Sequence, residues 1–350
     1  GWISARMNPL TYLIVNGAIM VLVWAGAFEV NTGKVSQGEM IALVSYMTQI
    51  LIAVVALANL IVSFTKALAS AGRINEVFAI CTTMESPKSR MEKVSDKKCE
   101  AVLFDHVQFR YHGSKEPALS DVTFSVSKGE TVGIIGGTGS GKSTLVNLIP
   151  RFYDASEGRV LFDGADVKEY PMEKLRGKIG IVPQKATLFR GTIRANIQWG
   201  KQDATDEEIY EALEIAQAKE FVQEKPKALD TMISQGGKNL SGGQRQRLTI
   251  ARALVRKPEV LILDDSASAL DFATDAKLRK AIAERTKNMT VFLVSQRAAS
   301  ILHADKIIVM DDGMVAGIGT HQQLLKTCEV YREICYSQLS KEEVEQYEKE

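Results

Sequence analysis

Two long runs without a charged residue limit what this chain can fold into more than any other feature. Met7 to Phe28 is an uncharged run of 22 residues, and Met40 to Thr65 is a second one of 26. At about 1.5 Å per residue, helices of these lengths reach roughly 33 and 39 Å, enough to cross a hydrocarbon core of about 30 Å. Core helices of a soluble protein are the alternative, but they rarely run so far without a charge. We therefore expect two transmembrane helices.

The residues that flank these runs predict a hairpin with both chain ends in the cytoplasm. The connecting loop, Glu29–Glu39, contains a turn-forming Gly33 and a single basic residue. Arg6 precedes the first run, whereas Lys66 and Arg73 follow the second. Because basic residues are concentrated in cytoplasmic segments, everything after Lys66 is expected to be cytoplasmic.

The second uncharged run has one polar face. At 100° per residue its polar side chains gather along one side of the helix, where they suit either hydrogen bonding between helices or the lining of a polar path. Two helices cannot enclose a path, so further helices are expected. The polar residues are Ser45, Thr48, Gln49, Asn59 and Ser63.

A linker rich in Ser, Lys, Glu and Pro is expected over residues 81–99. Alternating apolar residues at Val102–Phe104 and Val107–Tyr111 then predict short strands, so a soluble domain starts near residue 100. The 43 basic and 42 acidic residues leave a net charge of +1, which gives no electrostatic basis for binding nucleic acid. The four cysteines show no C-x-x-C spacing, so free thiols are expected at Cys81, Cys99, Cys328 and Cys335.

A phosphate-binding loop follows a predicted buried strand at Thr131–Ile135 and opens a predicted helix at Leu145–Ile149. Its pattern is G-x-x-x-x-G-K-[ST] in the required strand and helix context. Backbone N–H groups of such a loop surround the β-phosphate, Lys142 reaches the β and γ oxygens, and the Ser143 hydroxyl can bind Mg²⁺. A nucleoside triphosphate is the expected ligand. The predicted contacts in the loop are Gly136, Gly137, Thr138, Gly139, Ser140, Gly141, Lys142, Ser143 and Thr144.

A second apolar strand, Val260–Leu263, ends in Asp264. A carboxylate at the C-terminal end of a parallel strand can hold magnesium beside the phosphate loop. We therefore expect Asp264 and Ser143 to share one magnesium ion.

Further motifs in the expected order resemble the ATP-binding cassette (ABC) family. The run Leu240–Gln244 matches the L-S-G-G-Q signature, and Tyr111 matches the aromatic residue that stacks on adenine. Gln184 matches the Q-loop, a third candidate at the metal, and residues 268–271, Ser-Ala-Leu-Asp, match the D-loop. The nucleotide contacts that the resemblance adds are Tyr111, Gln184, Ser241, Gly242, Gly243, Gln244 and Asp271.

The resemblance implies a multi-domain exporter half-transporter. It assigns residues 1–80 to an all-α transmembrane hairpin with a cytoplasmic helix extension that ends at residues 71–74, and 81–99 to the linker. Residues 100–339 form the α/β P-loop cassette with antiparallel β and α-helical subdomains, and 340–350 an acidic tail. The family has six spans per half, so the two spans are the last of six and four are expected ahead of Gly1.

In the family two cassettes meet head to tail, and each ATP lies between one phosphate loop and the other cassette's signature. The resemblance thus implies ATP, Mg²⁺, a second half-transporter, lipid and a multi-pass location in the cell membrane. The substrate is left open among drugs, lipids and peptides. Importers of the superfamily usually carry spans and cassette on separate chains, so export is expected rather than import. Soluble ABC ATPases lack the spans, so the two uncharged runs argue against that class.

Two residues depart from the family pattern at the catalytic positions. The usual glutamate after the magnesium aspartate is Asp265, which is one methylene shorter. The switch-loop histidine is replaced by Gln296, which can donate a hydrogen bond to the γ-phosphate but cannot accept a proton or carry a positive charge. His303, seven residues later, is expected to be a loop or surface residue. Gln184 is the third candidate catalytic residue. Asp265 and Gln296 together suggest a site that holds ATP and cleaves it slowly, as in the degenerate subunit of a heterodimer. A homodimer with two slow sites and a nucleotide-sensing regulatory protein are the alternatives.

Overall fold

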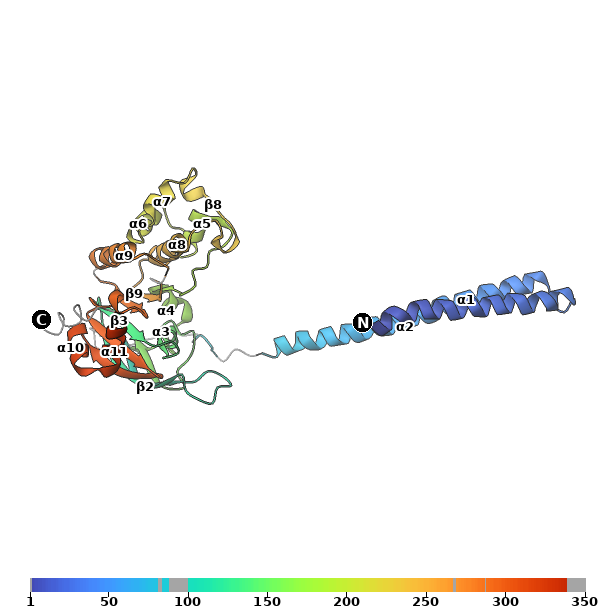
Figure 1. The fold of residues 1–350 in the computed structure, drawn as a ribbon, viewed down its shortest axis with the longest axis horizontal. Coiled ribbons are helices and arrows are strands. Elements are labelled where there is room, and N and C mark those ends of the chain that lie inside the picture. Colours follow the sequence, from blue (N-terminus) through green and yellow to red (C-terminus); the bar gives the residue numbers. More distant parts are fainter. Residues whose placement is uncertain (1, 81–83, 88–99, 267–268, 287, 339–350) are drawn as a thin grey trace. The chain divides into compact units, whose positions relative to one another are not determined.

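The computed structural model describes residues 2–80, 84–87, 100–266, 269–286 and 288–338. It divides into two compact units, Gly1–Thr83 and Met84–Glu350 (Figure 1). Three expectations lie partly or wholly outside the described residues: the linker apart from residues 84–87, Ser268 of the D-loop, and the acidic tail. The same is true of Cys81 and Cys99, whereas Cys328 and Cys335 are described as buried free thiols.

The first unit is a pair of helices, α1 (Trp2–Asn31) and α2 (Gln37–Phe78). Both are long and apolar enough to cross a membrane. The predicted loop Glu29–Glu39 was too long, because Ser36 caps α2: its hydroxyl accepts from the Glu39 N–H and the Glu39 carboxylate accepts from the Ser36 N–H. The predicted end at residues 71–74 was too early, since α2 continues to Phe78.

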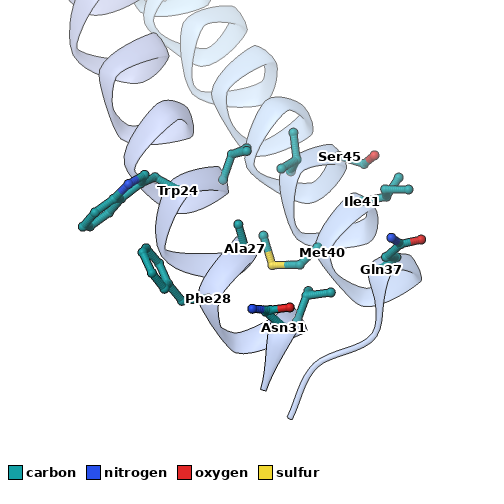
Figure 2. Close-up of a pocket in the computed structure, with 11 residues that line it drawn as sticks. Trp24, Ala27, Phe28, Asn31, Gln37, Met40, Ile41 and Ser45 are labelled. Carbon is teal, nitrogen blue, oxygen red and sulfur yellow. The ribbon is translucent and has the colours of Figure 1, made fainter. Parts of the chain in front are cut away.

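The two helices pack at the end near their connection. Figure 2 shows Met40 directed from α2 toward α1, where a Cβ at Gly26 would collide with its thioether. Trp24 and Phe28 meet edge to face on the outer side of α1 (Figure 2). On the polar face of α2, the Thr48 hydroxyl donates to the Val44 carbonyl within the same helix.

The second unit begins with an antiparallel sheet in the order β2-β1-β4-β5. The two short strands expected at 102–104 and 107–111 are one strand, β1, with a break in register after Phe104, where His106 takes a positive φ of 49°. Tyr111 therefore lies beyond the strand. The bounds are β1 (Glu100–Phe109), β2 (Leu119–Ser127), β4 (Glu157–Phe162) and β5 (Ala165–Asp166).

A six-stranded sheet in the order β12-β11-β3-β10-β9-β6 forms the centre of this unit, and all its strands are parallel except β12. Its inner strands are almost wholly buried and apolar, as expected of a parallel sheet covered on both faces. The strands are β3 (Thr131–Gly136), β6 (Ile179–Val182), β9 (Val260–Asp264), β10 (Thr290–Val294), β11 (Lys306–Asp311) and β12 (Met314–Gly319). The helices of this part are α3 (Lys142–Leu148), α4 (Met172–Lys178), α9 (Phe272–Arg285), α10 (His321–Thr327) and α11 (Glu329–Gln338), with a 3₁₀ turn, η3 (Ala298–Ser300).

A helical group inserted between β6 and β9 forms a separate lobe of the same unit (Figure 1). Its apolar residues join β9 and β10 in one core cluster, which ties the lobe to the sheet. Its elements are β7 (Gly191–Thr192), α5 (Ile193–Gln198), α6 (Asp206–Ile215), α7 (Lys219–Gln223), η1 (Ala228–Asp230), β8 (Met232–Ile233), η2 (Gln235–Gly237) and α8 (Gly242–Leu254). Its last helix, α8, starts directly after Ser241.

Candidate nucleotide-binding site

The glycine-rich loop joins β3 to α3, as its strand and helix context predicts. Gly141 is the N-cap of α3 with φ 93°, a left-handed conformation that favours glycine. At Gly136, where β3 ends, a Cβ would collide with the Met310 carbonyl oxygen of the neighbouring β11. A side chain at either position would strain or obstruct the backbone of the loop, so both positions require glycine.

Lys142 lies at the first position of α3 and is 8% exposed. Its ammonium donates to the carbonyl oxygens of Gly136 at 2.9 Å and Gly137 at 2.6 Å, and to the Ser140 hydroxyl at 3.2 Å. Burial lowers the pKa of Lys142, and the nearby carboxylates of Asp264 and Asp265 oppose that shift. The loop thus holds a cation against its own backbone carbonyl oxygens.

Ser143 and Asp264 meet although 121 residues separate them: the Ser143 hydroxyl donates to the Asp264 Oδ1 at 3.0 Å. The contact arises because β3 and β9 are parallel and only β10 separates them, so their C-terminal ends lie at the same edge. Burial raises the pKa of Asp264, and the hydrogen bond from Ser143 opposes that shift. A hydroxyl and a carboxylate side by side are oxygen donors of the kind that Mg²⁺ prefers, so these residues fit that ion.

A cavity of about 330 Å³ lies above this pair and collects the predicted residues from distant parts of the sequence. Across it, the Gln184 amide donates to the Asp265 Oδ2 at 3.0 Å, which ties the Q-loop to the residue after the magnesium aspartate. Ala118, Val294 and Ser295 also line it and were not predicted; Ser295 could have been found as the neighbour of Gln296. The predicted residues in the lining are Tyr111, Thr138, Gly139, Gly141, Lys142, Ser143, Thr144, Gln184, Asp264, Asp265 and Gln296.

Tyr111 forms one wall of the cavity. Its hydroxyl and the Thr144 hydroxyl are 2.9 Å apart, and its ring lies edge-on to those of Phe109 and Tyr153. The ring is 39% exposed, so it retains a surface that a purine could stack on. Tyr153, which supports it, was not predicted, and no motif marks it.

The signature residues are not among those that line this cavity. Ser241 caps α8 in the lobe of helices: its hydroxyl accepts from the Gln244 N–H, and the Gln244 amide oxygen accepts from the Ser241 N–H. Asp271 is also absent from the lining and caps α9 by accepting from the Thr274 N–H at 2.9 Å. One chain therefore does not bring Ser241, Gly242, Gly243, Gln244 or Asp271 to its own phosphate loop.

Comparisons with known proteins agree with this geometry. A model of the ABC transporter family matches residues 119–268. The chain is 42% identical over 334 residues to an ABC transporter ATP-binding protein, YfiB, of Bacillus subtilis, with 95% of this chain and 57% of the relative covered. The chain belongs to the ABC transporter family. Its relatives combine ATP-binding and permease segments, as in a probable multidrug resistance protein, YheI, of Bacillus subtilis, with 40% identity over 95% of this chain and 56% of that protein.

A relative that is named as a lipid flippase and a solved exporter structure extend the comparison. The ATP-dependent lipid A-core flippase of Vibrio vulnificus is 36% identical over 95% of this chain and 56% of its own length. A bacterial Atm1-family ABC exporter with ATP bound superimposes with a TM-score of 0.74 and 31% identity over 95% of this chain and 58% of that one. The chain has this exporter fold, in which transmembrane helices precede a P-loop cassette. It spans a little over half the length of the relatives it matches.

Proposed function

We propose that this chain is the ATP-binding subunit of an ABC exporter, which couples ATP binding and hydrolysis at a cassette dimer to the efflux of a substrate across a membrane. One observation carries the proposal: a single cavity joins the phosphate loop, Asp264, Gln184 and Tyr111, while the signature residues are not among those that line it. The first part is a binding site for ATP and Mg²⁺. The signature can act only on a nucleotide that is bound by another cassette.

Within the cavity each residue has a distinct task. Tyr111 stacks on the base, and Lys142 neutralises the β and γ oxygens when it exchanges its contacts with Gly136 and Gly137 for phosphate oxygens. Ser143, Asp264 and Gln184 would hold Mg²⁺, which neutralises phosphate charge when bound. The buried position of Lys142 and Asp264 strengthens these electrostatic contacts relative to water.

The signature would complete the ATP site of a second cassette. The capping box at Ser241 leaves the first N–H groups of a 13-residue helix available, and such a helix end favours an anion. A phosphate bound by a partner's loop supplies that anion. The partner is therefore another ABC half-transporter, joined to this chain through two shared nucleotides.

Its own site is proposed to hydrolyse ATP slowly. Asp265 is one methylene shorter than glutamate, its backbone φ is 46°, and its carboxylate accepts from Gln184. A carboxylate withdrawn by about 1 Å can cost roughly a hundredfold in rate. Gln296 lines the cavity but cannot exchange a proton as histidine does. Two changes on the hydrolytic side, with the binding side intact, favour the degenerate subunit of a heterodimer.

The location is proposed to be a cell membrane, with the cassette in the cytoplasm. The helices α1 and α2 are long and apolar enough to be the spans, and the basic residues Arg6, Lys66 and Arg73 support a cytoplasmic position of the cassette. The multidrug resistance and lipid flippase relatives support a drug or a lipid as the substrate, with peptides as the remaining class.

The test is a pair of substitutions in the complex with a half-transporter that carries Glu and His at the positions of Asp265 and Gln296. Asp265→Ala should leave most of the ATPase activity, because the competent site belongs to the partner. Ser241→Arg should abolish it, because the signature completes that site. Equal loss of activity in both variants would contradict the asymmetric arrangement. If this chain without the partner has the same ATPase activity as the complex, the slow homodimer is favoured.

A further inference from the structure

The last described residue of α11, Gln338, holds the loop that carries Gln296. Its side-chain oxygen accepts from the Ala298 N–H at 2.8 Å, and its side-chain nitrogen donates to the Gln296 carbonyl at 2.8 Å. A single amide thus bonds the backbone on both sides of Arg297, more than 40 residues earlier in the chain. No sequence motif marks Gln338.

The helix that carries Gln338 is firmly anchored. Tyr331 and Cys335 of α11 are 0% exposed and share a core cluster with Ile135 of β3 and Ala298. The Tyr331 hydroxyl also lies 2.7 Å from the His321 ring nitrogen at the start of α10. Because β3 leads into the phosphate loop, α11 connects the base of that loop to the segment after β10.

The Gln296 segment is held at its other end by the sheet itself. The Ser295 N–H donates to the Ile134 carbonyl of β3 at 3.0 Å, and the Arg297 N–H donates to the Ser295 hydroxyl at 2.9 Å. The Gln296 side chain is exposed and lines the ATP cavity. With no burial to orient that side chain, its direction depends on how its backbone is held, by Ser295 before it and by Gln338 after it.

We propose that Gln338 is a positioning residue for Gln296, which it orients so that the Gln296 amide faces the γ-phosphate of bound ATP. This inference rests on the proposed function, because it assigns Gln296 to the nucleotide. It makes the end of α11 a part of the ATP-sensing apparatus. The expected consequence is a preference for triphosphate over diphosphate that depends on Gln338.

The experiment compares Gln338→Met and Gln338→Glu in the full chain in detergent. Methionine keeps the length and removes both hydrogen bonds, whereas glutamate keeps the acceptor for the Ala298 N–H and removes the donor to Gln296. Ser337→Ala is the matched control, since its hydroxyl bonds only Ile334 within α11. Amide hydrogen exchange at Ala298 and the affinities for AMP-PNP and ADP are the readouts.

In Gln338→Met, exchange at Ala298 should accelerate and the preference for AMP-PNP over ADP should fall, each about fivefold, the usual scale of one hydrogen bond. In Gln338→Glu, only the preference should fall. Unchanged exchange at Ala298 in Gln338→Met, or an equal fall in Ser337→Ala, would overturn the inference. If the parent chain binds neither nucleotide, the proposed function fails, and the exchange measurement still decides whether Gln338 holds the loop.

Discussion

The two sides of the nucleotide cavity are built differently. On the phosphate side, Lys142 and Asp264 are 8% and 9% exposed, and their polar atoms are bonded to the glycine loop and to Ser143. On the hydrolytic side, Gln184 and Gln296 are exposed and lie in the loops that follow β6 and β10. The first side is pre-organised by the sheet, whereas the second depends on loops.

This difference suggests where a sequence can change without loss of binding. A buried cation or carboxylate that loses its partner is costly, so the phosphate side tolerates little variation. An exposed loop residue such as Gln296 costs little to replace, whereas Asp265 is half-buried and directly follows β9. Of the two unusual residues, Gln296 therefore lies where substitution costs the fold little.

The largest effect is expected from restoring the hydrolytic side. The double substitution Asp265→Glu with Gln296→His should raise the ATPase activity of this site about a hundredfold, because the longer carboxylate recovers the lost reach. Turnover in the complex with the partner's own site inactivated measures it. Asp312→Glu, at an exposed position in the turn after β11, is the matched control. No gain in activity would contradict the proposal that Asp265 and Gln296 slow hydrolysis at this site.

Removing the cation of the phosphate side should weaken binding by about tenfold or more. Lys142→Met deletes an ammonium whose charge-assisted contacts to phosphate are each worth about 1.5–3 kcal/mol. Nucleotide titration of the purified chain measures the loss. Lys174→Met changes an exposed lysine of α4 and should have no effect. Equal affinity in Lys142→Met and the parent would place the nucleotide elsewhere.

The buried carboxylate of Asp264 should lower the free energy of unfolding of the nucleotide-free chain, by an amount that depends on pH. Because the pKa of Asp264 is raised above 3.8, its protonated form is favoured by folding. Its contribution is therefore most favourable below that pH and declines as the pH rises through the raised pKa. Asp264→Asn escapes this loss and should be more stable than the parent at pH 7, with the gain shrinking as the pH falls through the raised pKa.

Urea unfolding at a series of pH values measures this gain, and Asp312→Asn, which alters an exposed carboxylate, is the control. The same Asp264→Asn variant should lose magnesium-dependent ATP binding. A stability gain that grows toward low pH would contradict the assigned direction of the shift.

The smallest effect is expected at the wall formed by Tyr111. Tyr111→Phe removes the hydroxyl contact with Thr144 and keeps the ring, so ATP affinity should fall no more than about threefold. Tyr111→Ala also removes the stacking surface and should cost more, measured with the same titration. If phenylalanine and alanine weaken binding equally, the ring contributes nothing and the hydroxyl contact accounts for the whole effect.

Local patterns predicted the pieces of this protein well. The glycine loop between a strand and a helix is a local arrangement, and β3 and α3 lie where its motif requires. Boundaries were less predictable, because they depend on caps. Ser36 extends α2 back to residue 37, and Ser241 sets the start of α8 at Gly242.

By itself, the sequence determined the fold class, the phosphate loop and the identity of the two unusual residues, because uncharged length, glycine spacing and residue type are local properties. Only the tertiary structure decided which residues meet. The parallel order of β3, β10 and β9 brings Ser143 to Asp264, and the parallel pairing of β6 with β9 brings Gln184 to Asp265. The packing of α11 brings Gln338 to the Gln296 loop. Such pairings depend on the register of strands and on the anchoring of helices far apart in the chain, which no local pattern encodes.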